Sequence, residues 1–396
     1  MKHTSRVKKS STFGSKKQYT IGMPSLLYLI RATVKRLAIC LLFVPIIGNT
    51  QHTQPPIKLG MSTALTGPAK HIGEQLALGS TIYFNKVNAR DGIHGQNIDL
   101  ILADDGYEPK NTVVNTRQFL FNDKIDAIFG SMGTPTANAI KPLLDRHRVP
   151  FLMPFTGADF LHNQSMPNVF NLRASYQDEA IEQINYLVQE RKHKKIGLMI
   201  QADEFGFLVE SNLIMALQKH DLVPVEVARF KRNSEEISKA LEQLKVSGVT
   251  AVCMVGTYQP LAEFINTGYE QGFKPDYTSV SFVSSFDLYS LIHHPSTIMV
   301  TEVVPDPNQC DNSLCKQFRA DIKPYNTSPN RIIFEGYLNA VALVSAAQKC
   351  TTPLNNQCLL TELNKLFSDT SEFADLFNNQ TNNTDKKIYR SYFKSN

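Results

Sequence analysis

Apolar and polar positions alternate along residues 57–64, and short apolar runs recur at 98–103, 125–130 and 149–153. Each run ends in small or polar residues, which is typical of a buried β-strand. Between the runs, apolar residues recur every three to four positions, and this spacing predicts helices. These helices cover residues 73–89, 110–123 and 135–147.

The same alternation continues through the middle of the chain. It predicts strands at 195–200, 223–230, 250–255 and 299–304, and helices at 176–191, 205–219, 234–246 and 260–271. Strands that alternate with helices of this length form parallel sheets covered on both faces. About eight strands before residue 260 are too many for one sheet of this kind, so we expect an α/β protein with two doubly wound parallel-sheet lobes.

The lobe boundaries are placed where the alternation of predicted strands and helices changes. The chain leaves the first lobe near residues 172–176, and Pro305 and Pro307 end a strand where it returns. An amphipathic helix is expected at 331–348 and a final edge strand at 388–393. The predicted first lobe is therefore 57–174 plus 305–348, and the second is 175–304 plus 349–396.

Charge is unevenly shared along the chain. The net charge is +5, but residues 1–36 carry nine Lys and Arg and no acid; without them, 32 basic residues face 36 acidic ones. The chain beyond the leader is therefore acidic, and we expect no nucleic-acid partner. With 42% hydrophobic residues, its composition is that of a globular protein.

The basic segment is followed by a short apolar run at 37–47 and by small residues at 48–50. Together these features predict a secretory signal peptide over residues 1–50, cleaved near Thr50/Gln51, with Met23 as a possible start. An uncleaved anchor is the alternative, but the run is short for a membrane span and Pro45 interrupts it.

Five cysteines follow the leader. Cys253 lies inside an apolar run and is expected in the core. Cys310 and Cys315, and likewise Cys350 and Cys358, lie in polar, turn-rich stretches, and each pair is expected to form a disulfide in an exported protein. A zinc site is the weaker alternative, because no CxxC spacing and no nearby His support it. We expect no metal and no cofactor.

Candidate binding residues follow the strands, because ligands of open α/β sheets bind beyond the strands' carboxyl ends. Residues 130–135 and 256–260 combine glycine, hydroxyls and a proline that opens a helix. Free N–H groups at such helix starts favour an anion, although ordinary capping by Thr134 is the alternative. Residues 150–158, 201–206 and 281–287 end three further strands, and Phe205 could instead be a hydrophobic staple.

No catalytic motif accompanies these segments. The chain has no Gly-x-Ser-x-Gly elbow, no phosphate-binding Gly-x-x-x-x-Gly-Lys and no His-Glu-x-x-His. We therefore expect a binding protein and not an enzyme.

Several segments, taken in order, resemble the type I periplasmic substrate-binding proteins, specifically the branched-chain amino acid receptor family of ABC importers. The resemblance runs from Ile57 to about Leu343. Its segments are Leu65-Thr66-Gly67-Pro68, Val87-Asn88-Ala89-Arg90-Asp91-Gly92-Ile93-His94-Gly95, Ala103-Asp104-Asp105, Ile128-Phe129-Gly130-Ser131, Val149-Pro150-Phe151, Asn168-Val169-Phe170, Arg173-Ala174-Ser175, Asp203-Glu204-Phe205-Gly206 and Val255-Gly256-Thr257-Tyr258.

The resemblance implies two lobes that are joined by a three-strand hinge and close over a small solute. It implies that first-lobe hydroxyl and N–H groups hold the ligand's carboxylate, and that second-lobe aromatic residues cover the ligand. The acid that holds an ammonium group in amino-acid receptors has no match here, because the nearest, Asp287, is out of register. A carboxylate without an ammonium group, such as an aromatic acid, is the natural alternative. The expected ligand-binding residues are Ser131, Gly133, Thr134, Phe155, Thr156, Gly157, Asp203, Phe205, Tyr258 and Ser285.

The sequence thus predicts a monomeric periplasmic protein that delivers a small carboxylate-bearing solute to an ABC permease in the inner membrane. A receptor that feeds a signalling partner is one alternative. An enzyme acting on a small acid is the other.

Overall fold

The computed structural model describes residues 54–162, 166–351, 355–368, 372–379 and 382–394. The predicted signal peptide and its cleavage site lie outside these residues. Within the described ranges, no helix has both the length and the apolar character needed to span a membrane.

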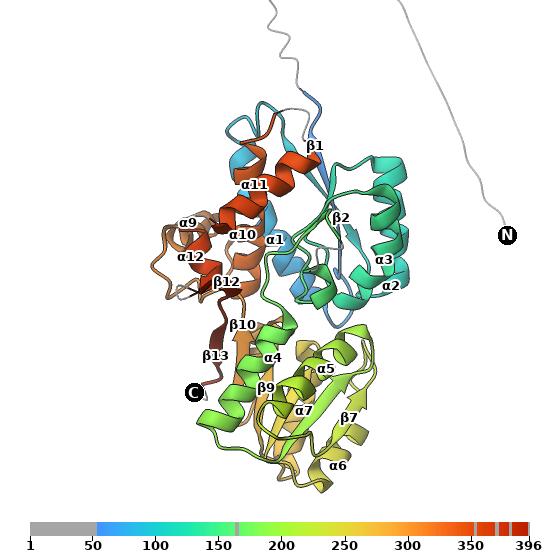
Figure 1. Ribbon diagram of the computed structural model, residues 1–396, viewed down its shortest axis with the longest axis vertical. Coiled ribbons are helices and arrows are strands. Elements are labelled where there is room, and N and C mark those ends of the chain that lie inside the picture. The colour runs from blue at the N-terminus through green and yellow to red at the C-terminus, as the bar shows by residue number, and fades with distance from the viewer. Residues whose placement is uncertain (1–53, 163–165, 352–354, 369–371, 380–381, 395–396) are drawn as a thin grey trace, which may run out of the picture. The chain divides into compact units, whose positions relative to one another are not determined.

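The first sheet contains five parallel strands in the order β2-β1-β3-β4-β5. Figure 1 labels β1 and β2 of this sheet. The strands are β1 Ile57–Thr63, β2 Ile98–Asp104, β3 Ala127–Phe129, β4 Phe151–Leu152 and β5 Val169–Phe170. The chain adds β2 on one side of β1 and then β3, β4 and β5 on the other side. Between β1 and β3, where the order changes direction, a crevice opens beyond the carboxyl ends of the strands.

The second sheet has the order β13-β10-β9-β8-β6-β7. Its strands are β6 Ile196–Gln201, β7 Val227–Phe230, β8 Ala251–Val255, β9 Asp276–Ser279, β10 Ile298–Glu302 and β13 Tyr389–Tyr392. The first five are parallel and repeat the order of the first sheet, with the reversal between β6 and β8. β13 pairs antiparallel with β10 at the sheet edge, so the predicted two-lobe α/β class and final edge strand are confirmed.

Helices flank both sheets. Those packed with the first sheet are α1 Lys70–Asn88, α2 Pro109–Gln118, α3 Thr134–His147, α9 Ser313–Asp321, α10 Arg331–Ala347, α11 Asn356–Ser368 and α12 Ala374–Phe377. Those packed with the second are α4 Tyr176–Asn185, α5 Glu204–Gln218, α6 Ser238–Val246, α7 Tyr258–Glu270 and α8 Ser285–Ser290. π-helical turns at Phe119–Asp123 and Tyr186–Glu190 extend α2 and α4, and 3-10 turns lie at Asp159–Leu161, Ser281–Val283 and Lys323–Tyr325. A two-stranded ribbon, β11 Asn378–Asn379 with β12 Asn382–Lys386, precedes β13.

The C-terminal segment is divided between the lobes differently from the sequence-based assignment of 349–396 to the second lobe. α11 packs on α10, and Leu359, Leu363 and Leu376 are buried in the core of the first lobe. Only β13 joins the second sheet. The physical reason is that α11 packs on α10 and α12 packs on α11, contacts that no local pattern specifies.

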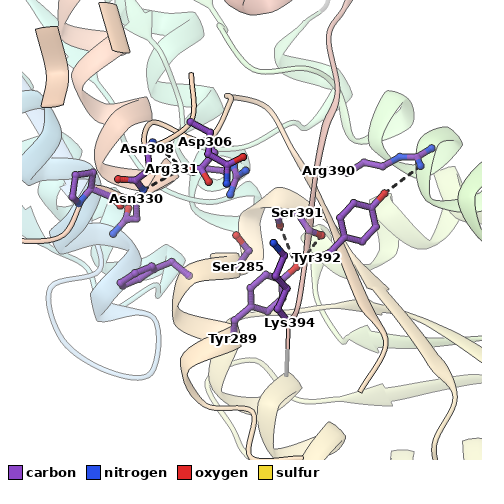
Figure 2. Close-up of a pocket in the computed structure, with 13 residues that line it drawn as sticks. Ser285, Tyr289, Asp306, Asn308, Asn330, Arg331, Arg390, Ser391, Tyr392 and Lys394 are labelled. Atoms are coloured by element: carbon purple, nitrogen blue, oxygen red, sulfur yellow. Dashed lines mark hydrogen bonds between the residues drawn. The ribbon is translucent and has the colours of Figure 1, made fainter. Parts of the chain in front are cut away.

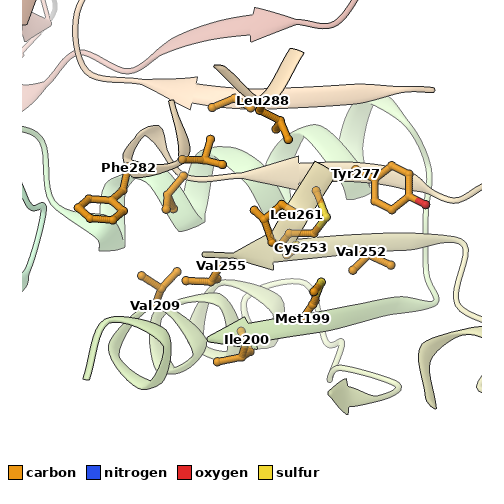
Figure 3. Packing of buried hydrophobic residues seen from close by; sticks show 14 of the residues in the cluster. Met199, Ile200, Val209, Val252, Cys253, Val255, Leu261, Tyr277, Phe282 and Leu288 are labelled. Atoms are coloured by element: carbon orange, nitrogen blue, oxygen red, sulfur yellow. The ribbon is translucent and has the colours of Figure 1, made fainter. Parts of the chain in front are cut away.

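Both predicted cysteine pairs form disulfides. The Cα atoms of Cys310 and Cys315 are 6.0 Å apart, and those of Cys350 and Cys358 are 5.9 Å apart. Cys253 is buried in β8 among apolar side chains, as predicted (Figure 3). One disulfide joins Cys310 to α9, and the other joins Cys350, just after α10, to α11.

Helices α1 and α10 cross so closely that their backbones touch. A Cβ at Gly79 would lie 1.9 Å from the carbonyl oxygen of Ile333, and a Cβ at Gly336 would lie 2.2 Å from that of Leu76. Since neither carbonyl can move independently of its helix, any side chain at these positions separates the two helices.

We expect Gly79→Ala to lower the free energy of unfolding by about 1–3 kcal/mol, even though alanine favours a helix by about 1 kcal/mol over glycine. Gly268→Ala in α7 is the matched control, because the nearest atom to its Cβ is the Leu241 Cδ1 at 3.3 Å, the end of a flexible side chain. That variant should be neutral or slightly stabilised. Urea unfolding of the two variants measures the difference, and equal effects would refute the backbone contact.

Candidate ligand-binding cleft

The candidate site lies beyond the carboxyl ends of the strands at which both sheets reverse. In the first lobe, Ser62 is the last but one residue of β1, and its N–H donates over 3.2 Å to the Oγ of Ser131, which follows β3. In the second lobe, Asp203 follows β6 and Tyr258 follows β8. In each lobe the candidate residues thus lie at the ends of the two strands between which the strand order changes direction.

A chain of three hydroxyl groups runs through the first-lobe side of this region. Thr134 Oγ1 lies 2.7 Å from Thr156 Oγ1, and Thr156 Oγ1 lies 3.3 Å from the hydroxyl of Tyr176. The N–H of Ala158 also donates to Thr156 Oγ1, over 3.2 Å. Thr156 donates to Tyr176, so Thr134 donates to Thr156, and the proton of the Tyr176 hydroxyl is the one that these two bonds leave free.

Two expectations about the start of α3 are wrong in detail. Gly133, not Thr134, occupies the N-cap position, so the Thr134 hydroxyl is not used for capping and pairs with Thr156 instead. The N–H of Gly133, which the resemblance assigned to a ligand carboxylate, donates to the carbonyl of Phe155 over 3.1 Å. Gly133 has φ +104°, and a Cβ there would lie 2.4 Å from the ring of Tyr107. Glycine therefore lets the Tyr107 ring lie against the backbone.

Gly157 also keeps a tight backbone turn next to the hydroxyl chain. Its carbonyl accepts the N–H of Tyr176 over 2.8 Å, and a Cβ there would lie 2.8 Å from the carbonyl oxygen of Ala174. Gly157 thus positions the Tyr176 hydroxyl beside Thr156.

Asp203 has a local structural role at the start of α5. Its Oδ1 accepts the N–H groups of Phe205 and Gly206 over 3.1 and 3.2 Å, and its Oδ2 pairs with Arg232 at 3.2 Å. Burial raises the pKa of Asp203, and Arg232 opposes this effect. The Phe205 ring is fully buried and packs 5.3 Å from the ring of Tyr176.

The two lobes touch at both rims of the cleft. On one rim the ring of Tyr258 stacks on His71 of α1, with centroids 5.7 Å apart, and Gln75 Nε2 donates to both carboxylate oxygens of Asp287 over 3.1 and 3.0 Å. Burial raises the pKa of Tyr258 to about 12. On the other rim Arg232 pairs with Glu108 at 3.0 Å. The structure is thus a closed form, and all ten predicted binding residues are buried.

Ser285 lies apart from the other predicted residues. It lines a pocket of about 340 Å³ that contains none of the other nine (Figure 2). Its hydroxyl donates to Glu302. Tyr289, Arg331 and Lys394 line the same pocket. The structure therefore does not bring Ser285 to the hydroxyl chain.

Sequence reasoning missed two aromatic residues of the cleft. Tyr107 follows β2, and its fully buried hydroxyl lies beside the side chain of Gln201. Burial raises the pKa of Tyr107 well above its ordinary value. Phe282 follows β9 and is fully buried, with its ring 5.7 Å from that of Tyr107. Both lie just after a strand, which is the rule that found the other candidates.

A buried ionic cluster lies where the chain first crosses between the lobes. Arg173 Nη1 contacts both carboxylate oxygens of Glu335, at 3.0 and 3.1 Å, and Nη2 donates to Ser281. Glu179 accepts from the N–H and the hydroxyl of Ser281 over 2.7 and 2.8 Å. Burial raises the pKa of Glu335 to about 7 against the opposing effect of Arg173, and burial also raises the pKa values of Glu179 and Glu302.

Two similarly wound sheets, joined by crossings and facing each other across polar strand ends, define a two-lobed α/β solute-binding protein. A family model described as "Periplasmic binding protein" matches residues 56–392. The chain therefore belongs to the periplasmic binding protein family, and its relatives are of the Leu/Ile/Val-binding type.

Three comparisons illustrate this relationship. Leu/Ile/Val-binding protein homolog 2 of Brucella abortus is 22% identical over 311 residues, which are 78% of this chain and 82% of that protein. The crystal structure of a possible leucine/isoleucine/valine-binding protein from Rhodopirellula baltica SH 1 has a TM-score of 0.78 and 28% identity, covering 85% of this chain and 94% of that one. A fatty acid ABC transporter substrate-binding protein from Thermomonospora curvata shares the fold, with a TM-score of 0.69 and 20% identity over 78% of this chain and 81% of that one.

Proposed function

We propose that this protein captures a small carboxylate-bearing solute between its lobes outside the cytoplasm and delivers it to an ABC permease. The basic and apolar leader supports export to the periplasm. The relatives are named as binding proteins and not as enzymes, which supports a binding role without turnover.

The observation that carries the proposal is the hydroxyl chain of Thr134, Thr156 and Tyr176. Its spare proton lies in a buried region, where a hydrogen bond to an ionised acceptor is worth more than in water. The Ser131 hydroxyl accepts the Ser62 N–H and keeps its own proton to donate. Together these groups offer two donors to the two oxygens of one carboxylate.

The acids of the second lobe do not favour a ligand ammonium group. Asp203 is used by the start of α5 and by Arg232. Asp287 accepts from Gln75 and Ser284, and Glu179 accepts from Ser281 and Thr301. Each carboxylate near the cleft thus has donors of its own, which supports a carboxylate ligand that lacks an ammonium group.

The relatives are compatible with this ligand class. The protein from Brucella abortus is named for branched-chain amino acids and that from Thermomonospora curvata for fatty acids. These ligands share a carboxyl group, while only the amino acids carry an ammonium group. A carboxylate is therefore the part that the ligands named for these two proteins have in common.

A thermal-shift panel of carboxylic acids and amino acids tests the proposal. At 100 times its dissociation constant, a ligand adds about 2.7 kcal/mol of stability. We expect Ser131→Ala and Tyr176→Phe to reduce the shift strongly, because each removes one donor and leaves a carboxylate oxygen unpaired. Ser211→Ala, an exposed hydroxyl on α5 that donates to the carbonyl of Phe207, is the control. An unchanged shift in both cleft variants would refute the carboxylate site.

A further inference from the structure

We propose that the ring of Phe282 sets the upper size limit of the ligand, so that the cleft accepts compact carboxylates and excludes aromatic ones. This inference rests on the proposed function. It narrows the ligand class that the hydroxyl chain alone leaves open.

The ring lies between the two lobes. Its centroid is 4.8 Å from that of Phe205 in the second lobe, and 5.6 and 5.7 Å from those of Phe155 and Tyr107 in the first. Figure 3 places Phe282 at the margin of the second lobe's apolar cluster, past the ends of the strands. The ring therefore extends from the second lobe into the region where a ligand's side chain would lie.

The partners of this ring are also the neighbours of the polar donors. Phe155 directly precedes Thr156, and Phe205 packs against Tyr176, so the aromatic contacts begin where the hydroxyl chain ends. A carboxylate bound to the hydroxyls would direct its substituent toward these rings. Because protein interiors are close-packed, a second aromatic ring does not fit beside that of Phe282.

The turn that carries Phe282 is held at both sides, so the ring cannot readily withdraw. On one side Ser281 is bonded through its N–H and its hydroxyl to Glu179, and Arg173 donates to the same hydroxyl. On the other side Ser284, with φ +63°, caps α8. A ligand that displaced the ring would have to break this buried network.

The experiment uses four acids that separate size from charge: propionate and benzoate, which lack an ammonium group, and L-alanine and L-phenylalanine, which have one. Binding to the purified wild type, Phe282→Ala and Phe282→Leu is measured by thermal shift and calorimetry. We expect the wild type to bind propionate at least 10-fold more tightly than benzoate, since even one methylene in a filled pocket changes affinity by about 10- to 200-fold. The two amino acids test whether an ammonium group is accepted, and the smaller of them should again bind more tightly.

Phe282→Ala should raise the affinity for the aromatic member at least about 10-fold, with Phe282→Leu in between. Phe286→Ala is the matched control: it lies four residues on, is 47% exposed and lines the separate pocket. It should bind as the wild type does. Circular dichroism checks that each variant is folded. If Phe282→Ala does not fold, the test uses Phe282→Leu, which is the smaller change.

The inference is overturned if the wild type binds benzoate or L-phenylalanine as tightly as the small acids, or if folded Phe282 variants keep the wild-type size preference. Binding of benzene to the variants shows whether the size limit set by Phe282 or the proposed carboxylate site is wrong. If Phe282→Ala gains benzene binding but no acid binds to any protein, the ring fills the cleft as inferred and the carboxylate site is wrong. If neither acids nor benzene bind to the variants, both are wrong.

Discussion

Replacing Arg173 with methionine is expected to lower the free energy of unfolding by about 3–5 kcal/mol. The Arg173 side chain is 1% exposed and that of its partner Glu335 is 3% exposed. Removing the guanidinium leaves the buried carboxyls of Glu335 and Glu179 without their cation, while Glu302 keeps Arg331 at 3.8 Å. An uncompensated buried charge costs far more than a surface one, so these groups must take up protons or the region must open.

The expected cost also includes contacts that join the lobes. Glu335 belongs to α10 of the first lobe and Ser281 to the second, and Arg173 bonds both. Its guanidinium also lies 4.1 Å from the ring centroid of Phe155. The variant should therefore weaken the closed arrangement of the cleft as well as the fold.

Two controls isolate the effect of burial. Arg229→Met breaks a pair with Glu210 at 2.6 Å, but the Arg229 side chain is 44% exposed, so we expect a loss of only about 0–1 kcal/mol. Combining Arg173→Met with Glu335→Leu should recover part of the loss, because it removes the charge that the single variant leaves unpaired. Urea unfolding measures all three. If Arg173→Met cost no more than Arg229→Met, the buried cluster would not stabilise the protein.

The order of strands and helices could be predicted because its signals are local. An apolar run that ends in Gly130 and Ser131, or a strand followed by Asp203, is visible in a few consecutive residues. Since parallel strands place their carboxyl ends at one edge, the same signals located the hydroxyls and aromatics of the cleft.

The missed features depend on partners far away in the sequence. Glu335 lies 162 residues from Arg173, and Ser281 lies 108 residues from it, so no spacing links them. The sequence predicts that the segment 281–287 lies at the end of a strand. Within this segment, the Phe282 ring packs against Phe155 and the Ser285 hydroxyl donates to Glu302. Which side chain of a turn faces a ligand is decided by what anchors the turn, and the anchors here are tertiary contacts.

The same cluster predicts how stability depends on pH. Glu335 has its pKa raised to about 7 in the folded protein, from an ordinary value of 4.5, chiefly because it is buried. Between these two values the folded state holds a proton that the unfolded state has released. The contribution of this group is therefore fully present below pH 4.5 and is lost as the pH rises through 7, by about 1.4 kcal/mol per pH unit and on the order of 3 kcal/mol in all.

Glu335→Gln keeps the shape of the side chain, and its amide oxygen can still accept from Arg173, but it cannot ionise. At pH 5 the variant should match the wild type, in which Glu335 is protonated. By pH 8 the variant should be the more stable of the two, and the difference should grow mainly between pH 5 and 7. The free energy of unfolding of the variant should still fall as the pH rises, because burial also raises the pKa values of Glu179 and Glu302.

Urea unfolding at pH 5, 6, 7 and 8, at one ionic strength, measures this difference. Glu210→Gln, which removes the carboxylate of the surface pair with Arg229, controls for the loss of one negative charge and should run parallel to the wild type. Parallel curves for Glu335→Gln and the wild type would mean that Glu335 stays ionised in the folded protein. In that case Arg173, and not burial, would control the charge of the carboxyl, and the cluster would hold the lobes together equally well at every pH in this range.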